Sequence, residues 1–328
     1  MLDLTISRRT LLGAAAAFGA AGALRMPDAA FAKAPPVGTQ APFFYRLKLG
    51  DLEATVVSDG QLGPVGEPKD IFPKASKQEL EELIKALFVT RKVVLDENVL
   101  VLNTGDQMVL VDSGLGTEKS FGPNSGRLLD SLKAAGIEPG SIDAVILTHA
   151  HPDHCWGLVG ADGKPNFPKA KICMHQADYD FWTDEGKLSN DQIKGWVSGT
   201  RKVLLPLRER ITFIKDGADV VPGVQAMHTP GHTVGHTSYV VTAGDETLVV
   251  LGDVAHHSAL SLARPHYVFG FDTDGEQGVA TRKKTFDMLA GNRTPFLAYH
   301  FPWPGIGHVS KDGDGYRFHP TPMRVVAE

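Results

Sequence analysis

The sequence has little cysteine and no excess of positive charge. Its 328 residues include two cysteines, Cys155 and Cys173, and 33 basic residues stand against 38 acidic ones. Two cysteines are too few for a disulfide scaffold, and each lies in an apolar stretch, so we expect buried free thiols rather than a bridge. The slight negative balance gives no support for a nucleic-acid partner.

The N-terminal apolar run is too short to anchor the chain in a membrane. It extends from Leu11 to Leu24, whereas a spanning helix needs roughly 20 apolar residues. Arg8 and Arg9 precede it, and the small-x-small motif "AFA" follows at 30–32. This order is typical of a twin-arginine signal peptide. It predicts cleavage after residue 32, a periplasmic protein and no stable membrane anchor.

The remaining chain, 33–328, has the periodicity of alternating strands and helices. A strand pair is predicted around Gly50 and Asp51, and a helix over 76–92 begins with a capping-box pattern at Ser76. Further helices are expected at 125–135, 176–183, 190–205 and 277–290, and strands at 142–147, 171–175 and 224–228. No linker is long or polar enough to divide this region, so it is predicted to be a single domain.

Two segments about 140 residues apart resemble each other. Residues 98–114 and 237–253 each contain two apolar strands joined by a Gly-Asp turn, and each has an aspartate at the end of its second strand, Asp112 and Asp253. Any hairpin can have this pattern. The pair nevertheless suggests two related halves, each a sheet with helices outside, and therefore an α/β fold with four α/β/β/α layers.

The stretch "ILTHAHPDHCWGL" at 146–158 places three histidines and an aspartate directly after a buried strand. His149 and His151 can converge on one cation, whereas the adjacent residues Asp153 and His154 point in different directions and suit a second. A catalytic zinc needs only three protein ligands. Four candidates in six residues therefore indicate two metals, or a ligand with a further role. Cys155 is interpreted as a packing residue.

Further candidate ligands follow three later strands. His232 lies in the Gly-rich loop "MHTPGHTVGH" with His228 and His236, which we expect to support the site rather than to bind metal. Asp253 ends a strand, and its two oxygens allow it to bridge two cations. His300 follows a short apolar strand.

The motifs "THAHPDH" (148–154), "TPGHT" (229–233) and "LGD" (251–253), with a late histidine, resemble the metallo-β-lactamase superfamily over nearly the whole chain after the signal. The stretches 44–60, 121–137, 281–284 and 301–308 resemble, more narrowly, methyl parathion hydrolase and its relatives. The resemblance implies that one metal is bound by His149, His151 and His232, and the other by Asp153, His154 and His300. It also implies that Asp253 bridges them, and that the protein is a homodimer.

Two dications at such a site share a water and lower its pKa toward 7, which makes a bridging hydroxide available as the nucleophile. Asp153 and Asp253 are thus the expected catalytic carboxylates. Histidine and aspartate suit zinc, manganese, cobalt or iron, with zinc favoured by the resemblance. Asp112 is predicted either to support a ligand histidine or to cap the turn "SGLG".

The resemblance further implies an aromatic substrate pocket formed by Phe121, Trp182 and Trp196. The expected function is hydrolysis of a small molecule, whether an organophosphate triester, a lactone or an aryl ester, and phosphotriesterase activity can be incidental to a lactonase or esterase role. Two other functions occur on this fold. A mononuclear iron persulfide dioxygenase lacks a counterpart of His300, and a non-catalytic periplasmic binding protein does not need the complete ligand set.

Overall fold

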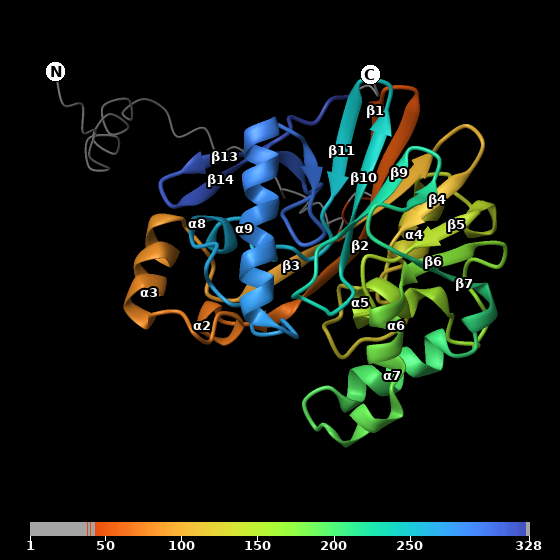
Figure 1. The fold of residues 1–328 in the computed structure, drawn as a ribbon, viewed down its shortest axis with the longest axis horizontal. Helices are drawn as coiled ribbons and strands as arrows, with labels where there is room; N and C mark the ends of the chain where they lie inside the picture. Colours follow the sequence, from red (N-terminus) through yellow and green to blue (C-terminus); the bar gives the residue numbers. More distant parts are fainter. Residues whose placement is uncertain (1–37, 39, 41–42, 326–328) are drawn as a thin grey trace, which may run out of the picture. The chain divides into compact units, whose positions relative to one another are not determined.

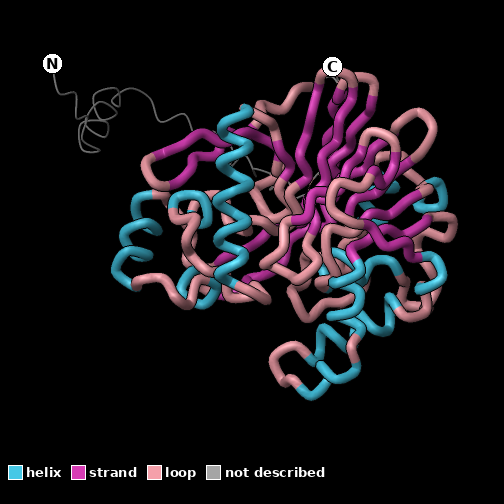
Figure 2. The backbone as a smooth tube through the Cα atoms, in the orientation of Figure 1, coloured by secondary structure: helices cyan, strands magenta, loops and turns pink. Residues whose placement is uncertain are grey.

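The computed structural model describes residues 38, 40 and 43–325, so the predicted signal peptide at 1–32 lies outside the described residues. Residues 43–325 belong to one compact unit. Figure 1 and Figure 2 show its strands in the interior and its helices outside them. Among the described helices, none is both long and apolar enough to cross a bilayer.

Within the described residues, fourteen strands form two seven-stranded sheets. The first has the order β1 (Phe44–Leu49), β2 (Leu52–Gly66), β3 (Val93–Asn103), β4 (Met108–Val111), β5 (Ala144–Ile146), β6 (Lys171–His175) and β7 (Ile211–Ile214). The second has the order β14 (Gly315–Pro320), β13 (Ile306–Asp312), β12 (Phe296–Leu297), β11 (Glu246–Val250), β10 (Thr237–Ala243), β9 (Val224–His228) and β8 (Asp219–Val221). Strands β4 to β7 run parallel, whereas β1 to β4 pair antiparallel.

The longest helix is α9 (Gly275–Asn292). The other helices are α2 (Pro68–Ile71), α3 (Lys77–Ala86), α4 (Leu128–Ala134), α5 (Pro152–Cys155), α6 (Gln176–Thr183), α7 (Lys194–Leu204) and α8 (Leu260–Ala263). Four 3-10 turns lie at Pro139–Ser141, Trp156–Leu158, Glu185–Ser189 and Arg208–Arg210.

Alternation of side chains along the strands produces the four predicted layers. In β3, Leu100 and Leu102 pack between the sheets, whereas Val99 and Val101 pack on the outer face with residues of α4 and α7. In β11, Leu248 faces the first sheet, whereas Val249 packs against α9. Successive strand side chains point to opposite faces, so each sheet has two apolar faces to cover. The α/β/β/α sandwich is confirmed.

Some element boundaries differ from the prediction. The helix expected over 76–92 ends at Ala86, because Phe88 has a left-handed φ of +54° that stops helical continuation, and β3 already begins at Val93. Strands β7, β8, β13 and β14 were not predicted. Cys155 and Cys173 are free thiols within the described part of the chain, as expected.

Candidate metal centre

The four residues of the first cluster lie where β5 ends and α5 begins. His149 and His151 occupy the connecting loop, and His151 is the N-cap residue of α5. Pro152 is the first helical residue, where its fixed φ favours helix initiation, so Asp153 and His154 lie in the first turn. All four side chains are thus held by a strand end and a helix start, and all four residues are buried.

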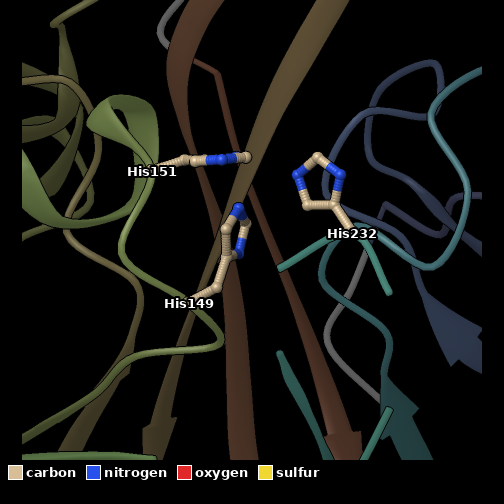
Figure 3. Close-up of side chains that lie close together, drawn as sticks. All are labelled: His149, His151 and His232. Atoms are coloured by element: carbon tan, nitrogen blue, oxygen red, sulfur yellow. The ribbon is translucent and has the colours of Figure 1, made fainter. Parts of the chain in front are cut away.

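The loops after β9, β11 and β12 bring the other three candidates to the same place. The ring of His232 lies 4.8 Å from that of His149 and 4.6 Å from that of His151, measured between centroids. Figure 3 shows these three rings gathered around a common point, with His232 on the loop that follows β9. Residues separated by more than 80 positions in sequence therefore share one centre.

Among the described residues, two of the five groups of possible ligand atoms coincide with those that the resemblance implies. His149, His151 and His232 form one set whose ligand atoms lie within 4.8 Å of one another. Asp153, His154 and His300 form a second such set. Asp253 reaches both, because its Oδ2 lies 3.3 Å from His232 Nε2 and 3.1 Å from His300 Nε2.

Hydrogen bonds hold the distal nitrogens of these rings and leave the converging nitrogens without partners. Nδ1 of His154 lies 2.9 Å from Asp112 Oδ2, Nδ1 of His232 lies 2.9 Å from Asp272 Oδ1, and Nδ1 of His149 lies 3.0 Å from Thr148 Oγ1. The buried Nε2 atoms of the same three rings have no hydrogen-bond partner among the described residues. A partner on Nδ1 fixes the tautomer with a lone pair on Nε2, which is the form that binds a metal. The donor set therefore fits two divalent cations.

The charges around the centre also favour cations. Burial alone lowers the pKa of His300, but the carboxylates of Asp253 and Asp153 outweigh it and raise that pKa to about 10. Burial opposes protonation of His154 as well, yet its neighbouring carboxylates hold its pKa well above the usual range. Both rings therefore lie at places where positive charge is stabilised.

Asp112 contacts His154 and Thr148, whereas Asp59 accepts a hydrogen bond from the turn that follows Asp112. Asp112 makes further hydrogen bonds as well. Its Oδ1 accepts the Thr148 backbone N–H at 2.7 Å and its Oδ2 accepts the Thr148 hydroxyl at 2.8 Å, in addition to the contact with His154. The backbone N–H of Leu115, in "SGLG", is instead accepted by Asp59 at 2.7 Å. Of the two predicted roles of Asp112, the structure thus shows the support of a ligand ring.

Three residues of the centre whose side chains are buried were not predicted. Asp272 holds His232, and Asp178 accepts the N–H groups of Ala150 and Gly235 at 2.7 and 2.8 Å, which ties the two histidine loops together. His256 lies with its Nε2 3.1 Å from Asp253 Oδ2. The doublet "HH" after "GDVA" was the available signal for His256, whereas nothing in their own segments marks the two aspartates.

His236 lies beside the centre, with its ring centroid 5.2 Å from that of His149, whereas His228 contacts another residue. Both nitrogens of His236 have partners: Nε2 accepts the backbone N–H of Asp253 at 2.9 Å and Nδ1 lies 2.9 Å from Thr229 Oγ1. His228 stacks on His175, with 4.4 Å between ring centroids. Cys155 is fully buried, and its Sγ faces Ala150 O at 3.5 Å, in agreement with a packing role.

A cavity of about 390 Å³ opens over the centre. Phe121 and Trp196 are among its lining residues, but Trp182 lies behind His151, 2% exposed and 4.8 Å from that ring. The helix α6 directs Trp182 into the core, so the structure does not place this predicted pocket residue in the lining. The rest of the wall is also largely apolar and includes Leu62, Val65, Leu95, Phe269 and Phe271.

Comparison with known proteins agrees with this architecture. The family profile described as "Metallo-beta-lactamase superfamily" matches residues 93–314. The solved structure of AidC, described as a dizinc quorum-quenching lactonase in complex with a product, is 27% identical, with a TM-score of 0.80 over 86% of this chain and 98% of its own. A hydrolase called AbOPH is 30% identical, with a TM-score of 0.78 over 87% of this chain and all of its own.

Curated relatives match a shorter region. An N-acyl homoserine lactonase of Bacillus sp is 30% identical over 148 residues, and one of Bacillus cereus is 27% identical over the same length. These matches cover 45% of this chain and 52% of each relative, so the chain spans about half the length of the curated relatives it matches.

Proposed function

The chain belongs to the metallo-β-lactamase superfamily, and from this premise we propose that it is a dinuclear metal-dependent hydrolase that opens lactone rings. The observation that carries the proposal is the position of the two ligand sets directly beneath an apolar cavity. His151 and Asp153, one from each set, line this cavity together with Asp253. A substrate in the cavity therefore meets both sets at once.

In this proposal His149, His151 and His232 would hold one cation. Asp153, His154 and His300 would hold the second, and Asp253 lies within reach of both sets. Two divalent cations bound there would supply a water of lowered pKa and a Lewis acid for the carbonyl oxygen of an ester, and zinc is the metal we expect. The dizinc description of AidC supports that expectation.

The chain's own carboxylates orient the reacting groups. Asp153 Oδ2 lies 3.4 Å from the Nε2 atoms of His154 and His300, and its side chain is 12% exposed toward the cavity. Burial alone raises the pKa of Asp153, but the two rings outweigh it and hold that pKa well below the usual range. The carboxylate thus stays ionised and can accept a hydrogen bond from a water at the centre.

The cavity wall contacts the part of the substrate that does not react, and so determines which substituents bind. Phe121, Trp196 and Phe271 present aromatic faces, and the ring centroids of Phe121 and Trp196 are 6.3 Å apart. Such a wall suits an apolar substituent on a lactone, and the lactonases among the relatives support this choice. Aryl esters and phosphotriesters remain the competing substrates, in line with the narrower resemblance to methyl parathion hydrolase.

Parallel assays decide among these substrates. We expect the purified protein to carry two metal equivalents and to hydrolyse an N-acyl homoserine lactone and dihydrocoumarin faster than methyl paraoxon, an aryl acetate or nitrocefin. His300→Ala should lose one equivalent and most of the activity. Phosphotriester turnover far above lactone turnover would overturn the lactonase assignment, and a single iron with persulfide oxidation would indicate the dioxygenase.

We also propose export and dimerisation. The signal at 1–32 predicts a periplasmic protein, which cell fractionation checks. A dimer agrees with the apolar side chain of Phe88, which is 93% exposed beside Leu87 at 40%. Light scattering on the purified protein should therefore give twice the chain mass.

A further inference from the structure

Arg282 is a buried cation in the long helix α9, close to the metal centre. Its side chain is 1% exposed, and it lines a small gap together with His232, Asp253 and Asp272. Removing a guanidinium from water is costly unless acceptors surround it, and its planar fork of five N–H donors can meet several acceptors at once. The contacts of Arg282 therefore show which segments its burial holds in place.

Three hydrogen bonds of Arg282 end on backbone carbonyl groups in two segments near the centre. Nε donates to the carbonyl oxygen of Val254 at 2.8 Å, directly after the predicted bridging ligand Asp253. Nη1 donates to the carbonyl oxygens of Pro265 and Tyr267, at 3.2 and 2.7 Å. The guanidinium thus holds the loop after β11 and the segment after α8 to the same helix.

A fourth contact reaches a ligand histidine through an aspartate. Nη2 of Arg282 lies 3.7 Å from Asp272 Oδ2, and Oδ1 of that carboxylate lies 2.9 Å from His232 Nδ1. Oδ2 also accepts the backbone N–H of Phe269 at 3.2 Å. Both oxygens of the carboxylate are therefore held, so the one that faces His232 cannot turn away without breaking the contacts of the other.

The same helix supports the loop that carries His232. Thr281 donates its hydroxyl to the carbonyl oxygen of Pro230 at 2.6 Å. A Cβ added at Gly231 would lie 2.2 Å from the backbone nitrogen of Gly278, so the loop and the helix touch backbone to backbone. Gly278 and Thr281, three positions apart, lie on one face of α9. The position of His232 thus depends on this helix as well as on its own loop.

We propose that Arg282 is a positioning residue of the metal centre, which acts through Asp272 on His232. This inference rests on the proposed dinuclear centre and adds a determinant of its first ligand set. A carboxylate behind a ligand histidine fixes the ring and keeps the proton on Nδ1, which leaves Nε2 for a cation. By holding that carboxylate and the loop after Asp253, Arg282 places ligands of the centre before a metal binds.

Arg282→Lys and Asp272→Asn test the two steps of this route. The lysine keeps the positive charge but has one ammonium group in place of the fork, so it cannot reach all four acceptors. Asp272→Asn removes the carboxylate that transmits the effect. Arg210→Lys is the matched control, because Arg210, directly before β7, also donates to two backbone carbonyl groups, those of Phe167 and Ala170.

The measurements are the two zinc affinities by competition with a chromophoric chelator, the visible absorption of the cobalt-loaded protein, and the Tm of the metal-free protein. Arg282→Lys should weaken one site about 3- to 30-fold and Asp272→Asn about 10- to 100-fold, and both should shift the cobalt bands. The double variant should bind no more weakly than Asp272→Asn alone, because both changes act on one route. Arg210→Lys should lower Tm and leave both affinities unchanged.

A purely structural role of Arg282 gives a different pattern. Unchanged affinities and cobalt bands in Arg282→Lys, with a Tm lowered as in Arg210→Lys, would overturn the inference. Additive losses in the double variant would overturn the route through Asp272. If Arg282→Lys does not fold, Asp272→Asn alone decides, because the route requires a weakened site in that variant.

Failure of the proposed function is distinguishable from failure of this inference. If the unchanged protein binds no metal, the dinuclear proposal fails, and the tautomer of His232 in the metal-free protein, measured by nitrogen NMR, then decides the role of Arg282. The proton should lie on Nδ1 in the unchanged protein and be divided between both nitrogens in Arg282→Lys. The same tautomer in both proteins would refute the positioning role.

Discussion

Replacement of Asp112 by asparagine tests how the fold prepares the metal centre. The carboxylate accepts three hydrogen bonds, from the Thr148 N–H, the Thr148 hydroxyl and His154 Nδ1–H. Asparagine has the same shape, but it has one acceptor oxygen, and that oxygen is needed by the Thr148 N–H. Its amide N–H₂ then faces His154 Nδ1 and favours the tautomer that carries the proton on Nε2.

That tautomer cannot offer Nε2 to a cation, so the change should weaken the set formed by Asp153, His154 and His300. Loss of a carboxylate behind a ligand histidine lowers metal affinity about 10- to 100-fold. This corresponds to about 1.4 to 2.7 kcal/mol of binding free energy. The other set should lose less, because Asp112 reaches His149 only through the Thr148 hydroxyl.

Competition against a chromophoric chelator measures the two affinities separately. Asp112→Asn should show one site of nearly unchanged affinity and one weakened site, with a folded circular dichroism spectrum. Asp106→Asn, an exposed aspartate in the hairpin turn, is the matched control and should alter neither site. Two sites of unchanged affinity in Asp112→Asn would refute the tautomer argument.

Three further predictions concern stability. Chelation should lower Tm, because each ion present at 1,000 times its Kd contributes about 4 kcal/mol to the folded state. Gly157→Ala should lower the free energy of unfolding by about 3 kcal/mol, because the added Cβ would lie 1.8 Å from the backbone oxygen of Ser113. Gly140→Ala is the control, since nothing lies within 4 Å of its added Cβ, and it should change that free energy by less than about 0.5 kcal/mol. Urea titrations measure both values. Burial lowers the pKa of His257 to about 4, so the unfolded chain binds a proton there below about pH 6.5 while the folded protein does not. His257 should therefore lower the free energy of unfolding by about 1 to 2 kcal/mol between pH 6.5 and 4, allowing for the partial exposure of the ring, and His257→Gln should remove this contribution.

The His257 prediction has a structural reason beyond burial. Its Nδ1 accepts the backbone N–H groups of Ala259 and Leu260, each at 3.2 Å, at the start of α8. Protonation would turn that acceptor into a donor and break both bonds. A pH dependence of stability that is identical in His257→Gln would contradict this assignment.

The sequence by itself predicted the layers of the fold and the candidate residues of the two ligand sets. Alternating apolar residues in 98–103 and 237–243 already imply two-sided strands, and ligands such as His149 and His151 lie at strand ends that local periodicity locates. Their grouping came from the resemblance, and the structure brings the same residues together.

The tertiary structure decided which side chains support and surround those ligands. Asp272 is hydrogen-bonded to His232, 40 positions away, and Asp59 accepts a hydrogen bond from the backbone N–H of Leu115, 56 positions away. Neither contact therefore leaves a local pattern in the sequence. Trp182 and Trp196 look alike in sequence, yet one packs into the core and the other lines the cavity. The reason is physical: a strand end or helix start depends on neighbouring residues, whereas a hydrogen-bond partner or a cavity wall depends on how distant segments pack.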